Sequence, residues 1–425
     1  MIEIFELKYG SSHKSFHLDT DLHPVSMIQP RFTPPPDNPI TETISNAIHH
    51  PLGNFSWDDI SPASHPKVAI AINDKTRPVP HETMLPPLLN FLQSKGYASE
   101  QITFMVATGT HTPLPKEEFT KILPEQMVKK YRIISHNCDD KDNLEYIGET
   151  TSGTPVWANA IFYHADLKIV IGNIEPHHFM GFSGGNKSAS IGVAGRETIT
   201  KNHGMITAPN AVVGKYEDNP MRMDVEEIGD IIGVSCALNV IMNTKREIIH
   251  ALFGTPRAVM QAGVPLCRST YQTEVPQYYD LVIASVGGYP KDINFYQAQK
   301  AMTHSALLTK PGGTVILVAE CREGSGSAGY EEIMAGVSNY EQALQLFLSQ
   351  PFRIGPHKAY QVARLLEKIN FHLVSELSPT LADKLCLQNS QNLQQIVDTA
   401  VQSLPAGTSI AVLPNAINTI PIIRE

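Results

Sequence analysis

Short apolar runs alternate with amphipathic stretches along most of the chain. From residue 66 onward, each run holds four or more strand-favouring residues and then breaks at a polar or glycine-rich turn. Such runs predict strands buried on both faces, and therefore mostly parallel sheets. The predicted strands lie at 67–74, 101–109, 167–173, 233–243, 281–288, 312–320 and 369–376.

The stretches between these strands predict helices. Residues 81–96 place leucines at helical spacing and end in glycine, which is typical of an amphipathic helix and its stop. Residues 255–263 form another helical pattern. Strand and helix in repetition indicate an α/β fold.

A polar, aromatic segment at 266–279 predicts a hinge between two domains. We expect an N-terminal cofactor-binding α/β domain over 1–270 and a C-terminal α/β domain over 276–404, with mostly parallel sheets around an interdomain cleft. The strand-like segment 405–425 is a candidate to return to the first domain. The second domain is expected to close over the active site and exclude water.

Composition narrows the class of protein. Hydrophobic residues make up 42% of the 425 residues, which excludes a disordered chain. The formal net charge of -9 provides no positive field, so we expect neither nucleic acid nor a membrane as a partner. The five cysteines form no C-x-x-C pair and the N-terminal residues do not resemble a signal peptide, so we expect a cytoplasmic protein.

Four loops that follow predicted strands carry reactive side chains. In open α/β sheets, ligands bind beyond the carboxyl ends of the strands. In the first loop, Asp74 and Arg77 are three residues apart, so the guanidinium can hold a carboxylate or phosphate while the acid orients it or a neighbouring imidazole. A loop stapled by a local ion pair is the alternative.

The second loop, Thr108-Gly109-Thr110-His111, offers hydroxyls, close backbone approach and an imidazole just before a predicted helix. A helix N-terminus disfavours the charged imidazolium, so His111 is expected to be neutral and able to accept a proton. A threonine-rich turn with one exposed histidine is the alternative.

The third loop is the densest. Its candidate residues, including one farther downstream, are His177, His178, Gly184, Gly185, Lys187 and His203. The phosphate-binding pattern G-x-x-x-x-G-K-[ST] fails because Asn186 precedes the lysine. A lysine beside a glycine loop can instead carry a covalent cofactor such as pyridoxal phosphate, and three histidines suit nickel or zinc. A glycine-rich turn with surface histidines is the alternative.

The fourth loop lies in the second predicted domain. If a helix begins near Asp292, Tyr296, Gln297 and Lys300 face one way and can meet a substrate carboxylate. A solvated helix lysine is the alternative for Lys300. We interpret Asp292 and the residues before it as a turn and a helix cap.

In order, the four loops read Asp-x-Thr-Arg-Pro-x-Pro, Ala-Thr-Gly-Thr-His, His-His-x-x-Gly-x-Ser-Gly-Gly-x-Lys with a following Asn-His, and Gly-Gly-x-Pro-Lys-Asp with Tyr-Gln-x-x-Lys. Together they resemble the nickel-pincer-nucleotide lactate racemase family, over roughly residues 67–320. The resemblance implies a racemase or epimerase of 2-hydroxy acids such as lactate. It also implies a pyridinium-3-thioamide-5-thiocarboxylate mononucleotide that clamps Ni²⁺, and cofactor-biosynthesis enzymes that supply it.

The resemblance also implies roles for individual residues. Lys187 would form the covalent link to the cofactor, and His203 would be the protein ligand to nickel. His111 and His177 would be the paired acid and base, because hydride transfer from C2 leaves a hydroxyl proton to be accepted on either face. The implied substrate-binding residues are Asp74, Arg77, Gln297 and Lys300. The implied neighbours of the cofactor are Thr108, Gly109, Thr110, Gly184, Gly185 and Tyr296.

One position departs from the family pattern, because Ile191 stands where we expect a proline before Gly192. Isoleucine frees φ and restores a backbone N–H, so the pocket wall is expected to differ and lactate itself is not assumed. A non-catalytic protein that binds the nickel-pincer cofactor is the main alternative function. An enzyme that uses pyridoxal phosphate on Lys187 is a weaker one.

Overall fold

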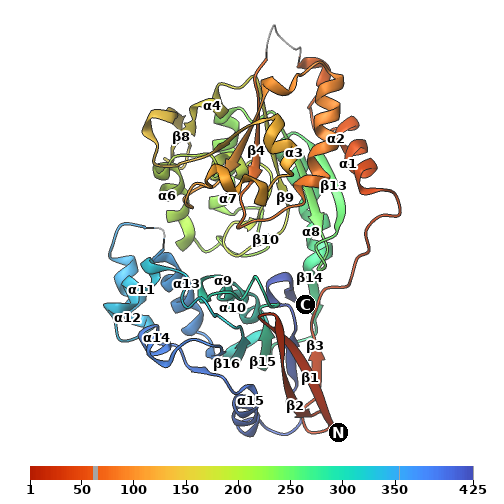
Figure 1. Ribbon diagram of the computed structural model, residues 1–425. Helices are drawn as coiled ribbons and strands as arrows, with labels where there is room; N and C mark the ends of the chain where they lie inside the picture. Colours follow the sequence, from red (N-terminus) through yellow and green to blue (C-terminus); the bar gives the residue numbers. More distant parts are fainter. Residues whose placement is uncertain (61–65, 354, 425) are drawn as a thin grey trace. The chain divides into compact units, whose positions relative to one another are not determined.

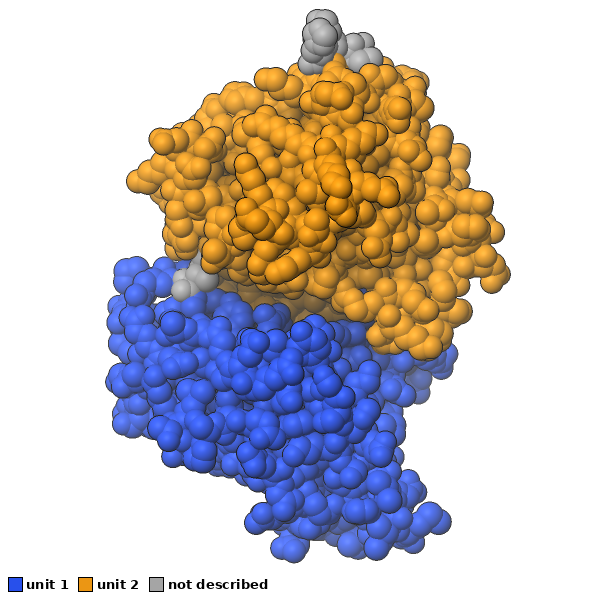
Figure 2. Space-filling view, viewed as in Figure 1, with its two compact units in different colours: residues 1–31, 271–425 blue, residues 32–270 orange. Residues whose placement is uncertain are grey.

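The computed structural model describes residues 1–60, 66–353 and 355–424 (Figure 1). The chain divides into two compact units: unit 1 comprises residues 1–31 and 271–425, and unit 2 comprises residues 32–270 (Figure 2). Each unit is built around its own six-stranded sheet, which confirms an α/β fold with mostly parallel sheets. Within the described residues, no helix has the length and apolar character needed to cross a membrane.

The sheet of unit 2 has the strand order β13-β12-β9-β4-β5-β6. Neighbouring strands are parallel except β12 and β13, which are antiparallel. All residues of β4 and β12 are buried, which explains their nearly continuous apolar sequences. The strands are β4 (Val68–Asn73), β5 (Ile102–Ala107), β6 (Arg132–Ser135), β9 (Leu167–Asn173), β12 (Cys236–Met242) and β13 (Ile248–Gly254).

The order of these strands creates a switch point between β4 and β9. From β4 the chain builds β5 and β6 on one side, and then crosses to build β9, β12 and β13 on the other. The loops that leave β4 and β9 therefore run in opposite directions, which opens a crevice at the carboxyl ends of these strands.

Helices and two small hairpins surround this sheet (Figure 1). Apolar residues of α1 and α2 pack with the strands in one hydrophobic core. The helices are α1 (Ile40–His49), α2 (His81–Ser94), α3 (Glu125–Lys130), α4 (Ala160–Tyr163), α5 (Lys187–Ser190), α6 (Arg196–Gly204), α7 (Pro220–Ile232) and α8 (Pro256–Tyr271). The hairpins pair β7 (Leu144–Glu149) with β8 (Pro155–Asn159) and β10 (Pro176–His177) with β11 (Gly181–Phe182).

The sheet of unit 1 has the order β18-β17-β16-β15-β19-β3, with all neighbours parallel. An N-terminal hairpin of β1 and β2 buries Leu7 and Phe16 in the same core as β15 and β16. The strands are β1 (Ile2–Tyr9), β2 (Ser12–Asp19), β3 (Val25–Met27), β14 (Gln272–Val275), β15 (Tyr279–Ser285), β16 (Thr309–Val318), β17 (Asn370–Val374), β18 (Asn389–Ser390), β19 (Ile410–Leu413) and β20 (Ile420–Ile423).

The helices of unit 1 connect these strands. They are α9 (Phe295–Ala298), α10 (Lys300–Ala306), α11 (Ala328–Ala335), α12 (Tyr340–Leu348), α13 (His357–Leu366), α14 (Pro379–Lys384) and α15 (Leu393–Gln402). Both α10 and α15 pack against β16.

The division of the chain differs from the predicted one at both ends. Residues 1–31 belong to unit 1, because β3 pairs with β19 and the hairpin packs on the unit 1 core. The segment 405–425 does not return to the N-terminal unit, because β19 pairs with β15 and β20 with β14. The segment 266–279 contains the end of α8 and all of β14 rather than an irregular hinge, and the units divide between residues 270 and 271.

Candidate active site

A pocket lies in unit 2 where β4, β5 and β9 end. Its position is the crevice that the switch point between β4 and β9 creates. Its lining residues are Asn73, Asp74, Arg77, Ala107, Gly172, Asn173, Ser183, Gly184, Lys187, Ser188 and Gly192. Three side chains predicted from two separate motifs, Asp74 and Arg77 from the first and Lys187 from the third, therefore meet at one site.

Asp74 and His111 form a carboxylate–imidazole pair beside this pocket. The distance from His111 Nδ1 to Asp74 Oδ2 is 2.8 Å. The other carboxylate oxygen accepts hydrogen bonds from the Thr76 hydroxyl at 2.7 Å and the Thr76 backbone N–H at 3.1 Å. The Asp74 side chain is 7% exposed and that of His111 is 45% exposed, so a buried acid holds a solvent-accessible imidazole.

The pKa of Asp74 indicates which atom of the pair carries the proton. Burial alone raises this pKa, but the hydrogen bond and charge of His111, the Thr76 hydroxyl and the Arg77 charge together lower it below its ordinary value. The carboxylate is therefore ionised near neutral pH and can only accept. It follows that His111 carries a proton on Nδ1, and its Nε2 is the acceptor when the ring is neutral.

Two glycines shape the turn that presents Lys187. Gly184 and Gly185 have φ values of +88° and +56°, in the left-handed region that glycine tolerates best. A Cβ on Gly185 would lie 2.6 Å from Met260 Cγ and 2.7 Å from an Arg222 nitrogen. Met260 and Arg222 thus occupy the space that a side chain at position 185 would need. Lys187 begins the short helix α5 with only 4% of its surface exposed.

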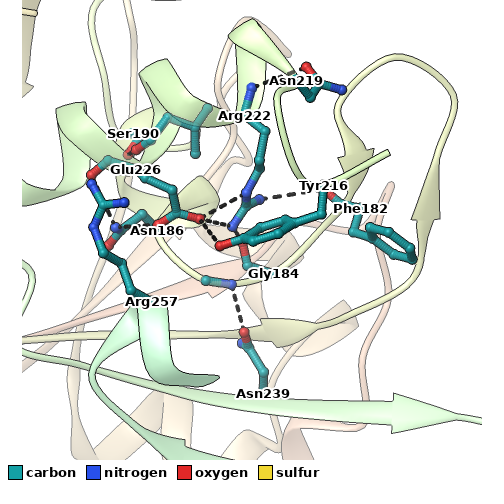
Figure 3. A network of polar contacts seen from close by, with 12 residues as sticks. Phe182, Gly184, Asn186, Ser190, Tyr216, Asn219, Arg222, Glu226, Asn239 and Arg257 are labelled. Atoms are coloured by element: carbon teal, nitrogen blue, oxygen red, sulfur yellow. Dashed lines mark hydrogen bonds and ion pairs between the residues drawn. The ribbon is translucent and has the colours of Figure 1, made fainter. Parts of the chain in front are cut away.

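A network of buried polar side chains forms hydrogen bonds to this turn (Figure 3). Arg222 and Glu226, one turn apart on α7 and both with fully buried side chains, form an ion pair of 2.5 Å. Arg222 also donates to the carbonyl of Gly184 at 3.0 Å, and Glu226 accepts from Asn186 Nδ2 at 2.9 Å. The residues on both sides of Gly185 are therefore bonded to one ion pair.

Two further contacts complete the network. Asn239 on β12 accepts from the backbone N–H of Gly185 at 2.7 Å (Figure 3). Burial, followed by the Glu226 charge, raises the pKa of Tyr216 to about 12, so its hydroxyl stays protonated and donates to Glu226 at 3.2 Å. None of these supporting residues was predicted from the sequence.

A ring of aromatic contacts joins His177 to His203. The Phe179 ring centroid lies 4.5 Å from that of His177 and 5.4 Å from that of His203, with edge-on geometry in both cases. His178 stacks on His177 at 4.7 Å. The backbone N–H of Met180 donates to His177 Nδ1 at 3.3 Å, so the neutral His177 ring carries its proton on Nε2.

The helix that carries His203 is anchored by a second buried acid. Asn202, fully buried on α6, donates to Asp224 Oδ2 on α7 at 2.8 Å. The same carboxylate group accepts from the hydroxyls of Thr150 at 2.6 Å and Thr154 at 3.1 Å. The position of His203 is thus set by the residue beside it.

The two turns that are predicted to face the cofactor, at 108–110 and 184–186, make hydrogen bonds to other parts of unit 2. The Thr108 hydroxyl donates to the carbonyl of His136 at 2.6 Å. The backbone N–H of Gly109, at φ +56°, donates to the carbonyl of Gly192 at 2.9 Å. The backbone N–H of Gly185 is also bonded, to Asn239. Of the three glycines in the two predicted turns, Gly184 lines the pocket and Gly109 and Gly185 do not.

The backbone of Ile191 is hydrogen-bonded to the turn that carries Lys187. Its backbone N–H, which a proline would lack, donates to the carbonyl of Lys187 at 3.0 Å. Its side chain is 5% exposed. The isoleucine therefore adds a bond to the loop that carries the lysine.

The residues of the fourth motif lie together in unit 1. Tyr296 and Gln297 are on α9, Lys300 begins α10, and Lys300 Nζ donates to the Gln297 side-chain oxygen. Helix α9 begins at Phe295, three residues after Asp292, so the interpretation of Asp292 as the helix cap is wrong. The cap is Asn294, whose side chain accepts from the backbone N–H of Gln297, while Asp292 is buried and accepts from the backbone N–H of Gly10 at 2.7 Å.

No group of three or more His, Cys, Asp or Glu side chains that could hold a metal ion is found within the described parts of the chain. A metal ion bound here by a single histidine would therefore need its other ligands from a cofactor or substrate.

Two family models match the chain. The lactate racemase N-terminal domain matches residues 9–214 and the lactate racemase C-terminal domain matches residues 275–421. A curated lactate racemase from Lactiplantibacillus plantarum is 30% identical over 387 residues, which cover 89% of this chain and 90% of that protein. A lactate racemase from Thermoanaerobacterium thermosaccharolyticum is 33% identical over 291 residues, 68% of each chain.

Solved structures agree with these matches. The lactate racemase apoprotein from Thermoanaerobacterium thermosaccharolyticum aligns with a TM-score of 0.91 and 26% identity, and the alignment covers 100% of both chains. A Thermotoga maritima protein aligns with a TM-score of 0.67 and 16% identity over 91% of this chain and 97% of that one, which shows a shared fold alone.

Proposed function

Because this chain belongs to the lactate racemase family and is a racemase, we propose that it inverts the C2 centre of a 2-hydroxy acid, either lactate or a related compound. We propose that the reaction uses a nickel-pincer nucleotide bound to Lys187. The observation that carries this proposal is the meeting of Lys187, Arg77 and the Asp74–His111 pair at the switch-point pocket. A reactive tether, an anion-binding cation and a base are the groups that the reaction needs.

The residues of unit 2 fit the proposed cofactor. Lys187 lines the pocket while only 4% exposed, and Gly184, three residues earlier, lines it with main-chain atoms alone. We propose His203 as the one protein ligand of nickel, since the cofactor supplies the remaining donors. When bound, the cofactor would supply an electrophilic carbon able to accept hydride from C2 and to return it.

The two histidines are proposed to handle the hydroxyl proton. His111, with its Nδ1 proton held by the Asp74 carboxylate, accepts the proton at Nε2. His177, with Nδ1 bonded to a backbone N–H, presents the opposite tautomer and can return a proton from Nε2. Inversion needs both, because the keto intermediate is reduced on the face opposite to the one from which it formed.

The substrate carboxylate is proposed to meet guanidinium or ammonium groups. Arg77 lines the pocket in unit 2. In unit 1, we propose that Gln297 and Lys300 bind the carboxylate or hydroxyl of the substrate. We also propose that cofactor-biosynthesis enzymes are needed for activity.

The test is co-expression of the chain with the cofactor-biosynthesis enzymes, followed by mass spectrometry of the Lys187 peptide, nickel analysis and chiral assays. We expect an adduct on Lys187, about one nickel per chain, and inversion of a 2-hydroxy acid. The Lys187→Arg variant is the matched control and should carry neither adduct nor activity. An unmodified mass for the wild-type chain after co-expression would contradict the proposal.

Two other results would identify the alternatives. An adduct with nickel but no inversion over a panel of 2-hydroxy acids would favour a non-catalytic cofactor-binding protein. A near-visible absorbance band that disappears with borohydride would favour pyridoxal phosphate on Lys187.

A further inference from the structure

The Thr76 hydroxyl contacts both members of the carboxylate–imidazole pair. Its oxygen lies 2.7 Å from Asp74 Oδ1 and 3.3 Å from His111 Nδ1. The first contact is a short hydrogen bond to a charged group, and the second is longer and weaker. Thr76 is exposed on the loop after β4, so polar contacts rather than burial hold its side chain in place.

The direction of these hydrogen bonds follows from the charge of Asp74. The ionised carboxylate can only accept, so the Thr76 hydroxyl donates its one proton to Asp74 Oδ1. The Thr76 oxygen then faces His111 Nδ1 with lone pairs alone. Both oxygens next to this nitrogen are therefore acceptors, and the neutral imidazole carries its proton on Nδ1. Thr76 thus favours the same tautomer of His111 as Asp74 does.

The same hydroxyl also sets the orientation of the Asp74 carboxylate. The hydroxyl and the backbone N–H of Thr76 both donate to Oδ1, which leaves Oδ2 for His111 at 2.8 Å. Arg77 is a competing partner for this carboxylate. Burial raises the pKa of Asp74, and the Arg77 charge is among the causes that lower it, so the guanidinium is close enough to act on the acid.

The Arg77 guanidinium nevertheless makes no ion pair or side-chain hydrogen bond with any residue that the structure describes. An ion pair with Asp74 would turn the carboxylate away from His111 and neutralise a cation that lines the pocket. The two hydrogen bonds from Thr76 oppose this pairing, because they hold the carboxylate in one orientation. The guanidinium therefore stays available to an anion in the pocket.

We propose that Thr76 is a positioning residue of the racemase, which holds the Asp74 carboxylate against His111 and keeps it from pairing with Arg77. The inference rests on the proposed function, because it concerns how the proposed base and the proposed carboxylate-binding residue are kept apart. Thr76 acts through its hydroxyl. Its backbone N–H, which most substitutions retain, continues to bond Asp74 Oδ1 when the hydroxyl is removed.

The first test measures kinetics on the cofactor-loaded enzyme. Thr76→Val removes the hydroxyl and keeps the branched shape of the side chain. We expect kcat to fall by about 10- to 100-fold, the range of one hydrogen bond to a charged group. We expect KM to rise by about 2- to 5-fold, the range of one exposed ion pair, because Arg77 then pairs with Asp74. Thr76→Ser keeps a hydroxyl and should stay within about threefold of the wild type in both constants.

The second test is nitrogen-15 NMR of the full chain without cofactor, in which His111→Gln identifies the His111 signals by difference. We expect the neutral wild-type ring to be mainly the Nδ1–H tautomer. In Thr76→Val, the ratio of this tautomer to the Nε2–H form should fall by about 2- to 10-fold, the range of one ordinary hydrogen bond. Thr112→Val is the matched control, because Thr112 is exposed beside His111 and its side chain makes no hydrogen bond to the described residues. It should change neither the tautomer ratio nor kcat.

An unchanged tautomer ratio, kcat or KM in Thr76→Val would overturn the inference. Equal losses in Thr76→Ser and Thr76→Val would also overturn it, since the hydroxyl would then not be the active part. If the loaded wild type inverts no 2-hydroxy acid, the proposed function fails, while a tautomer shift in Thr76→Val still supports the positioning of Asp74 and His111. If the wild type inverts a 2-hydroxy acid and Thr76→Val behaves identically, the proposed function stands and the role of Thr76 is wrong.

Discussion

The two proposed acid–base histidines lie in contrasting surroundings. His111 is 45% exposed and its Nδ1 faces the Asp74 carboxylate at 2.8 Å, whereas the His177 ring packs against His178 and Phe179. His177 Nδ1 accepts a hydrogen bond from a backbone N–H. The neutral rings thus carry their protons on opposite nitrogens. A site that must accept a proton on one face and return it on the other gains from such an unequal pair.

The two halves of the site also differ in how they are supported. Asp74, Thr76 and His111 make a short local cluster on the loops after β4 and β5. The loop after β9 is held by buried charges on α7, with Arg222 and Glu226 on the lysine turn and Asp224 beside His203. We therefore expect changes in the first half to alter rate and changes in the second to alter stability and cofactor loading.

The largest effect is expected from Asp74→Asn. The amide cannot stabilise an imidazolium and can donate to His111 Nδ1, which favours the wrong tautomer. We expect kcat to fall by about 10²- to 10⁴-fold, the usual contribution of an acid–base residue. Nickel content and the Lys187 adduct should stay as in the wild type, as measured on the same preparation. A fall in loading equal to the fall in kcat would contradict the division between the two halves.

Glu226→Ala should instead act on stability. It leaves the fully buried Arg222 without its carboxylate, and loss of one partner of a buried pair costs about 3–5 kcal/mol of unfolding free energy. Denaturant unfolding measures the loss. The double variant Arg222→Met with Glu226→Leu is the matched control: it should regain most of the stability but still load less cofactor, because the Gly184 carbonyl and Asn186 lose their partners. Full loading of the double variant would show that the network does not position the lysine turn.

A smaller effect, on unfolding free energy, is expected when the pH is lowered. The folded pKa of Asp74 is lowered, so its carboxylate stabilises the fold at pH values above the ordinary Asp pKa of about 3.9, and this contribution is lost as pH falls through the folded pKa. The stability difference between wild type and Asp74→Asn should therefore shrink as pH falls from 6 to below about 4. Unfolding curves at several pH values measure it, and a constant difference would mean that Asp74 is not the group that titrates.

The smallest effect is expected from Arg196→Ala. Arg196 begins α6, and its ion pair with Asp139 at 2.5 Å joins two side chains that are about half exposed. Exposed pairs contribute about 0.2–1 kcal/mol, so unfolding free energy should change by no more than this and nickel content should not change. A loss of nickel would show that the outer end of α6, and not only the Asn202–Asp224 contact, sets the position of His203.

The sequence predicted the strands that are buried on both faces, because such strands are nearly uniform in apolar character. It did not predict the hairpin of β1 and β2, whose residues alternate between exposed and buried and include many polar side chains. The pairing of β3 with β19 joins residues almost 400 positions apart and leaves no local pattern. The unit boundaries at both chain ends were therefore beyond a local analysis.

As with the fold, the site residues that could be predicted from the sequence are those that follow a local pattern. Residues in loops after strands were found because parallel strands bring their carboxyl ends to one edge, and Asp74, Arg77 and Lys187 meet there. The supporting charges were missed because Arg222 and Glu226, four residues apart on a helix, have the spacing of an ordinary exposed ion pair. Only packing against the glycine turn shows that both are buried. The roles of the site residues stay predictions.

The hydrogen bond from the Gly109 N–H to the Gly192 carbonyl has a consequence for how this protein can evolve. It joins the loop that carries His111 to the loop that carries Lys187 through main-chain atoms, which few side-chain replacements can delete. Gly192 itself is constrained, since a Cβ there would lie 2.4 Å from the Ser188 carbonyl oxygen. Mutation can therefore change the walls of the pocket, and with them the substrate, while the spacing of these two loops is inherited unchanged.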